Sequence, residues 1–171
     1  DRIKVEQDDL SSMHFRFSPA PHSGKVAVLA SSIGKFYDDL EVLRDINLEI
    51  ERGAKIAFVG KNGEGKTTLA KIIVNQLDHA GKLELGHKVM IGYYAQNQAE
   101  LLDGDKTVLK TIEEASNENT FNRVRDILGS FLFSGDTAEK KVKVLSGGER
   151  ARVALCKLLM DPINLLIMDE P

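Results

Sequence analysis

Three segments in the first third of the chain alternate apolar with polar residues, or run continuously apolar, and each is bounded by turn-forming residues. This pattern predicts β-strands rather than helices. Two further stretches of the same kind follow, one divided by a glycine at position 86 and one close to the end of the sequence. The predicted strands are "KVAVLAS" (25–31), "VLRDINLEI" (42–50), "AKIAFVG" (54–60), the two halves of "KLELGHKVMIGYYAQ" (82–96) and the buried strand "NLLIMDE" (164–170).

Apolar residues recur at helical spacing in three other segments. "GKTTLAKIIVNQL" (65–77) is the first, and "SGGERARVALCKLLM" (146–160), which begins with a glycine pair, is the last. Between them, residues 108–133 are predicted to be mostly helical, because one face carries an apolar stripe. The stripe is predicted to be core and consists of Phe121, Val124, Ile127, Leu128 and Phe131.

Composition describes an ordinary globular protein. The 171 residues suit one domain, and 42% apolar with 29% charged residues allows a sizeable core. The net charge of −3 gives no overall attraction to nucleic acid. The single cysteine, Cys156, excludes an internal disulfide and is interpreted as a small apolar residue of its helix. With no membrane-length apolar stretch and a charged N-terminus, the expected location is cytoplasmic.

Residues 1–23 differ in character from the rest. "DRIKVEQDDL" is charged, and "FSPAPHSG" holds two of the four prolines. The segment is interpreted as a linker that becomes ordered around "MHFRF", whose alternation fits a short strand. A disordered tail is the alternative interpretation.

The stretch "GKNGEGKT" (60–67) follows a predicted strand, precedes a predicted helix and matches the phosphate-binding P-loop. Glycines let backbone N–H groups converge on phosphate oxygens, and the helix N-terminus adds partial positive charge. Lys66 can reach the β- and γ-phosphates, and Thr67 can offer its hydroxyl to Mg²⁺. The residues predicted to contact the phosphates are Gly60, Asn62, Gly63, Gly65, Lys66, Thr67 and Thr68.

The apolar strand ending in "DEP" supplies two carboxylates of the Walker B type. Asp169 is expected to help hold Mg²⁺, and Glu170 stands where a carboxylate can polarise an attacking water. Lys66 and Glu170 are therefore the predicted catalytic residues. A strand-end turn acid is the alternative for such a run by itself.

The stretch "LSGGER" (145–150) has two possible roles. Adjacent glycines at a helix start expose N–H groups to a phosphate, so Ser146, Gly147, Gly148 and Glu149 are predicted to form a second phosphate-contacting motif. Alternatively Ser146 is a helix N-cap and Glu149 completes a capping box. Both interpretations are compatible.

With these three motifs, residues 25–171 resemble an ATP-binding cassette (ABC) ATPase, in which LSGG is the signature motif facing the P-loop of a second cassette. The resemblance implies an α/β P-loop core of ABC type with an antiparallel β subdomain and a small helical subdomain. It implies ATP and Mg²⁺ as ligands and a second cassette, in the same parent chain or a homodimer, as partner. Gln96 resembles the Q-loop glutamine that senses Mg²⁺ and water, with Gln98 as competitor. Tyr37 resembles the aromatic that stacks on adenine, although Phe36 is adjacent and either ring could be core.

Within this family the chain looks most like the second cassette of an ABC-F protein, whose members act on ribosomes. Only 30 residues separate Lys66 from Gln96, and the residues around the signature and Walker B motifs are similar to those of ABC-F proteins. The resemblance implies an interdomain linker ending at residues 1–23, a cassette at 24–171 and a helical subdomain at 97–145. The ribosome and tRNA are further expected partners, without membrane insertion. A soluble ATP-binding subunit of a transporter is the alternative function.

The family pattern continues after Asp-Glu-Pro with a D-loop and a switch histidine, which this sequence does not contain. The resemblance therefore implies a cassette truncated after Walker B. Such a chain is expected to bind nucleotide weakly and to be a poor or inactive ATPase alone, while the intact parent hydrolyses ATP. A basic cluster formed by residues 139–143 with Arg150 and Arg152 is interpreted as solvated surface, with RNA contact as the minority alternative.

Overall fold

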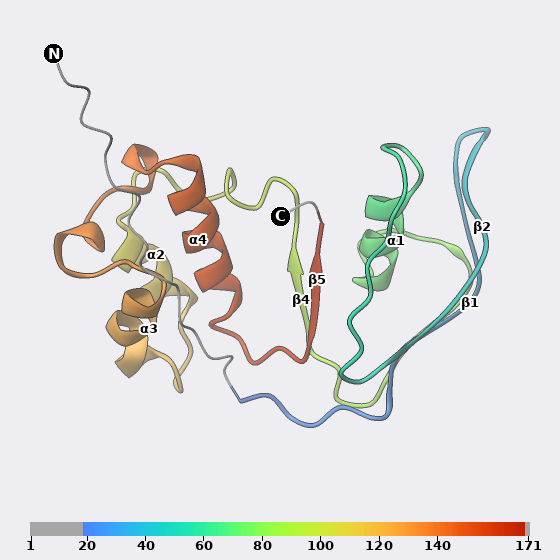
Figure 1. Cartoon of the computed structure of the whole chain (residues 1–171), viewed down its shortest axis with the longest axis horizontal. Helices are drawn as coiled ribbons and strands as arrows, with labels where there is room; N and C mark the ends of the chain where they lie inside the picture. Colours follow the sequence, from blue (N-terminus) through green and yellow to red (C-terminus); the bar gives the residue numbers. More distant parts are fainter. Residues whose placement is uncertain (1–18, 170–171) are drawn as a thin grey trace, which may run out of the picture. The chain divides into compact units, whose positions relative to one another are not determined.

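The computed structural model describes residues 19–169, which divide into two compact units (Figure 1). One unit contains residues 19–101 and 158–169, and the other contains residues 102–157. The short strand predicted around "MHFRF" lies outside the described residues.

An antiparallel three-stranded sheet is the centre of the first unit. Strands β1 (Val26–Tyr37) and β2 (Leu40–Glu51) form a long hairpin through a two-residue turn in which Asp38 adopts a positive φ of 50°. Strand β3 (Ala80–Leu85) pairs with the other edge of β1, giving the order β2-β1-β3. The predicted strands at 25–31 and 42–50 are thus present, and β1 continues six residues further than expected.

Helix α1 (Lys66–Ile73) packs its apolar side into the core of this unit, where Leu69, Ile72 and Ile73 join Val28 and Ile33 of β1. The helix is shorter than the predicted 65–77. It ends because Asn75 takes a left-handed conformation (φ 58°), and the amide of Gln76 then bonds the carbonyl of Lys71. The residues after the helix therefore form a turn that leads into β3.

Two short parallel strands complete the first unit. Strands β4 (Ile91–Tyr94) and β5 (Leu165–Met168) pair in the register Ile91 with Leu165, and the amide of Asp169 extends the pairing to the carbonyl of Tyr94. The division of residues 82–96 into two strands near Gly86 is confirmed. Strand β5 is half-buried rather than buried, since Met168 is 45% exposed.

The predicted strand at 54–60 is wrong for the described structure. These residues have no strand conformation and are all exposed, with Val59 94% exposed. A strand needs a partner strand, and none of the described strands forms a ladder with this segment, whose Ala54 amide makes only a turn bond to the carbonyl of Glu51 at the end of β2. Instead Ala54, Ile56, Ala57 and Phe58 line one wall of an apolar groove of about 400 Å³, and β5 lines the other.

The second unit is helical. It contains α2 (Val108–Ala115), α3 (Val124–Ser130) and most of α4 (Gly147–Leu158), with short 3₁₀ turns at Phe121–Arg123, Gly135–Thr137 and Val142–Val144. Its buried side chains include Val108, Ile112, Leu128, Phe131, Phe133 and Val153. None of the helices in the described part of the chain is long and apolar enough to cross a membrane.

The predicted stripe at 121–131 is correct for Val124, Leu128 and Phe131, which are buried, but wrong for Phe121, which is 60% exposed. Helix α3 begins only at Val124, after a 3₁₀ turn that contains Phe121. Because a 3₁₀ turn has a different period from an α-helix, the phase of the stripe does not extend back through it.

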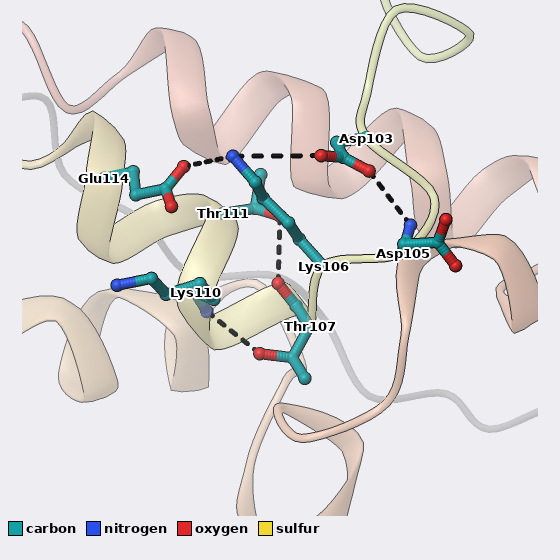
Figure 2. A network of polar contacts seen from close by, with 7 residues as sticks. All are labelled: Asp103, Asp105, Lys106, Thr107, Lys110, Thr111 and Glu114. Carbon is teal, nitrogen blue, oxygen red and sulfur yellow. Dashed lines mark hydrogen bonds and ion pairs between the residues drawn. The ribbon is translucent and has the colours of Figure 1, made fainter.

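Helix α2 begins with a local polar network, shown in Figure 2. The Thr107 hydroxyl caps the helix by accepting the amide of Lys110, and its carbonyl accepts the Thr111 hydroxyl. The ammonium of Lys106 lies between Glu114, at 2.6 Å, and Asp103, at 3.8 Å. These contacts fix where the helix starts.

Candidate nucleotide-binding site

The loop from Gly60 to Gly65 precedes α1 and depends on glycine at two positions. Gly63 and Gly65 have φ values of 84° and 87°, in the left-handed region that side chains disfavour. A Cβ added at Gly65 would also lie 2.8 Å from the Leu43 side chain. Gly65 is the N-cap of α1 and has no side chain to cap it, so the first amides of the helix are available to an anion.

Two charged side chains fold back onto this loop. The Lys66 ammonium donates to the carbonyls of Gly60, at 2.9 Å, and Lys61, at 2.7 Å. The Glu64 carboxylate accepts the amide of Lys61 at 2.7 Å. The ammonium is therefore held over the loop by neutral carbonyls, which phosphate oxygens can replace with stronger charge-assisted bonds.

A pocket of about 460 Å³ opens over the loop, a volume typical of small-molecule sites. The structure brings together in its lining all the predicted nucleotide-binding residues except Gly60. Tyr37 lines it and Phe36 does not, and Gln96 lines it and Gln98 does not. The lining residues are Tyr37, Val42, Asn62, Gly63, Gly65, Lys66, Thr67, Thr68 and Gln96.

Val42 also lines the pocket, although its sequence position does not predict this. It lies on β2, just across the hairpin turn from Tyr37. The apolar pattern of residues 42–50 predicts the strand, but it does not indicate which strand end meets the P-loop.

Asp169, at the end of β5, is buried and both of its carboxylate oxygens accept hydrogen bonds. Thr67 donates to one oxygen at 2.9 Å and Tyr93 of β4 donates to the other at 3.1 Å. Burial, and then the bond to Asp169, raise the pKa of Tyr93 to about 12, so the phenol stays protonated as a donor. Tyr93 could not be identified from the sequence, because an alternating strand does not indicate which tyrosine reaches a carboxylate.

The oxygen donors near this bond fit a magnesium ion. Thr67 offers a hydroxyl, Gln96 an amide oxygen and Asp169 a carboxylate, and Mg²⁺ prefers such hard oxygen ligands. Thr67 and Gln96 line the same pocket, and Asp169 is one hydrogen bond away from Thr67.

Replacing Tyr93 by phenylalanine tests how much the Tyr93–Asp169 hydrogen bond contributes to stability. The change leaves one oxygen of a buried carboxylate without its donor, so the free energy of unfolding is expected to fall by about 1–3 kcal/mol. Urea denaturation of the chain measures this. Tyr37→Phe removes a hydroxyl from a side chain that is 43% exposed and is the matched control. Equal unfolding midpoints for the two variants would show that the Tyr93 bond contributes nothing.

The signature residues belong to the other unit, and there they form a complete capping box. The Ser146 amide donates to the Glu149 carboxylate at 2.7 Å, and the Glu149 amide donates to the Ser146 hydroxyl at 3.2 Å. The bond from the Ser146 backbone holds the pKa of Glu149 below its usual range. A Cβ added at Gly147 or Gly148 would meet nothing within 4 Å. The glycines are therefore dictated neither by crowding nor by a positive φ in this unit. Glu170 lies outside the described residues.

Several charges of the basic cluster have partners inside the protein. Lys143 pairs with Asp105 at 2.7 Å, and Arg150 donates to the Leu145 carbonyl. The guanidinium of Arg152 lies over the Phe133 ring, 5.5 Å from its centroid. These contacts favour the interpretation of the cluster as an ordinary protein surface.

Comparison with known proteins identifies the family. A family model described as "ABC transporter" matches residues 43–171, which is 129 of the 171 residues, and the chain belongs to that family. Its similarity to a solved "bacterial Atm1-family ABC exporter with ATP bound" covers 89% of this chain and 30% of the exporter chain. The TM-score is 0.72 and the identity is 23%, which shows that the fold is that of an ABC cassette.

The relatives place the chain beside the ABC-F branch. It is 43% identical over 161 residues to "ABC transporter F family member 5" of Arabidopsis thaliana, covering 93% of this chain and 23% of the relative. It is 40% identical over 157 residues to "ATP-binding protein Uup" of Escherichia coli, covering 89% of this chain and 25% of the relative. The predicted resemblance to ABC-F cassettes is confirmed, and the chain spans about a quarter of the length of these relatives.

Proposed function

We propose that this chain binds ATP with Mg²⁺ and forms an ATPase site of an ABC-F protein that acts on the ribosome in the cytoplasm. The main support for a nucleotide site is that Tyr37, the glycine loop, Lys66 and Gln96 all line the same pocket. This pocket is joined to Asp169 through the Thr67 hydroxyl.

Each residue has a distinct role in this proposal. The loop amides and Lys66 bind the phosphates, and Tyr37 stacks on the base. Thr67, Gln96 and Asp169 hold Mg²⁺, which when bound would neutralise phosphate charge. Glu170 orients the attacking water for in-line displacement, and Lys66 stabilises the charge that develops on the transferred phosphate.

In this proposal a second cassette completes the nucleotide site with its signature motif. The exposed residues Ser146, Gly147 and Gly148, with the half-buried Glu149, contact the γ-phosphate held by an opposing cassette, whose own signature closes over this pocket. The contacts exist only while the γ-phosphate is present, so hydrolysis releases the closed form and makes a conformational switch. The chain alone is therefore expected to bind ATP weakly and to hydrolyse it poorly.

The ribosomal role is supported by the sequence relatives and by the short spacing between Lys66 and Gln96. In the corresponding organisation, residues 1–23 are the end of an interdomain linker that reaches toward tRNA. Residues 24–171 are the cassette, with a helical subdomain at 97–145.

Sedimentation of ribosomes from a cell lysate tests this role. The full-length protein carries Glu170→Gln and the matching change in its other cassette, so that it stays in the ATP-bound closed form. It is expected to pellet with ribosomes when ATP is present and to leave them when ATP is removed. Protein that instead fractionates with membranes and ignores ribosomes contradicts the ABC-F role and favours an ATP-binding subunit of a transporter.

A further inference from the structure

Lys35 is a charged residue in a core position of β1. Its side chain is 8% exposed, and it follows Ile33 at the alternate spacing that places side chains on one face of a strand. Lysine is rarely buried without a partner, because the ammonium loses its hydration. An apolar residue would fill this position at no such cost, so the contacts of the ammonium indicate what the lysine does.

One contact is an ion pair with Asp78 in the turn between α1 and β3, at 2.7 Å. The Asp78 side chain is 93% exposed, so water competes strongly for its carboxylate. The hydrogen bond from Lys35 nevertheless holds the pKa of Asp78 below its usual range. The ion pair holds the ammonium in place, but an exposed partner does not explain why the lysine side chain is buried.

The second contact is with Tyr37, two residues further along the same face of β1. The Lys35 ammonium lies over the Tyr37 ring, 5.2 Å from its centroid, within the range of a cation–π interaction. Tyr37 is 43% exposed and lines the pocket above the glycine loop. The ammonium therefore lies over one face of the ring, while the ring is partly exposed and lines the pocket.

We propose that Lys35 is a positioning residue, which fixes the Tyr37 ring against the pocket so that its free face is ready to stack on the base of the nucleotide. Asp78 fixes the lysine in turn. The inference rests on the proposed nucleotide site and deepens it. In this arrangement Asp78 orients Lys35, Lys35 orients the Tyr37 ring, and the ring binds the base. The phosphates are bound by the loop. Without this arrangement, ATP binding must itself immobilise the ring, at an entropic cost.

Comparing ATP with inorganic triphosphate separates the two parts of the site, because triphosphate has no base. In the complete chain with Mg²⁺, Lys35→Met keeps the length of the side chain and removes its charge. It is expected to raise the Kd for ATP by about 3- to 10-fold, the cost of ordering one side chain, and to leave the Kd for triphosphate unchanged. Lys35→Arg keeps a cation over the ring and is expected to restore ATP binding.

Two controls keep the test specific. Lys25→Met removes another ion-paired lysine, the partner of Glu51 at the far end of the same hairpin, and is expected to change neither Kd. In a Tyr37→Ala background, Lys35→Met is expected to have no further effect on ATP binding, because the ring it positions is absent. Because this second comparison uses the same lysine change with and without Tyr37, it measures only the part of the effect on ATP binding that depends on the Tyr37 ring.

Three results would overturn the inference. If Lys35→Met weakens ATP and triphosphate equally, the lysine supports the fold rather than the base contact. If it changes neither, the contact with Tyr37 is incidental. A wild-type chain that binds triphosphate but gains nothing from the base removes the role of Tyr37, whereas one that binds neither ligand contradicts the proposed function itself.

Discussion

Replacing Glu170 by glutamine is expected to slow ATP hydrolysis by about 10²- to 10⁴-fold, the usual contribution of a general base, while ATP binding persists. The amide keeps the size of the side chain but cannot accept a proton from the attacking water. Asp169, one residue earlier, accepts hydrogen bonds from Thr67 and Tyr93 and so has a different task. Steady-state phosphate release from the full-length protein, beside equilibrium ATP binding, measures the two effects separately.

Glu49→Gln is the matched control for this change. Glu49 is an exposed carboxylate on β2, and its replacement alters the net charge by the same amount. It is expected to leave turnover unchanged. A Glu170→Gln protein that hydrolyses ATP at the wild-type rate would remove Glu170 from the mechanism.

Replacing Lys66 by alanine is expected to weaken ATP binding by about 10- to 100-fold, because a charge-assisted hydrogen bond to phosphate contributes about 1.5–3 kcal/mol. The same change removes a positive charge that stabilises the transferred phosphate, so turnover at saturating ATP is expected to fall as well. Isothermal titration calorimetry gives the change in Kd, and phosphate release gives the change in kcat.

Folding is not expected to suffer from the Lys66 change. Among the described residues the Lys66 ammonium bonds to the carbonyls of Gly60 and Lys61 in its own loop, and the core of this unit is built from α1 and the sheet. Lys71→Ala, on the same helix, is the control and should bind ATP as wild type does. If the two variants bind ATP equally, the loop is not a phosphate site.

The parts of the site that are local in sequence could be predicted from it. The loop from Gly60 to Thr67 carries its chemistry in consecutive residues, and the structure brings most of them to one pocket with Tyr37 and Gln96. Residues that reach the site through the fold could not be predicted in this way. Tyr93 meets Asp169 only because β4 and β5 pair in parallel across 76 positions of sequence.

The fold shows the same limit. The two strands of the hairpin and α1 could be predicted because their apolar period is clear, but the strand predicted at 25–31 is shorter than β1. Strand β1 continues to Tyr37, and the charged Lys35 stands at one of its buried positions. The structure explains this lysine by its contacts with Asp78 and Tyr37, which the sequence does not reveal. The segment 54–60 shows the opposite error: its sequence predicts a strand, but no strand among the described residues pairs with it.

Photolabelling with an azido derivative of ATP at the adenine ring tests the central claim most directly, because it shows both binding and place. We expect saturable labelling of a peptide that contains Tyr37, suppressed by excess ATP and reduced in the Lys66→Ala variant. Labelling that ATP does not suppress, or that falls on peptides away from Tyr37, the glycine loop and Gln96, would contradict the assignment of this pocket as the nucleotide site.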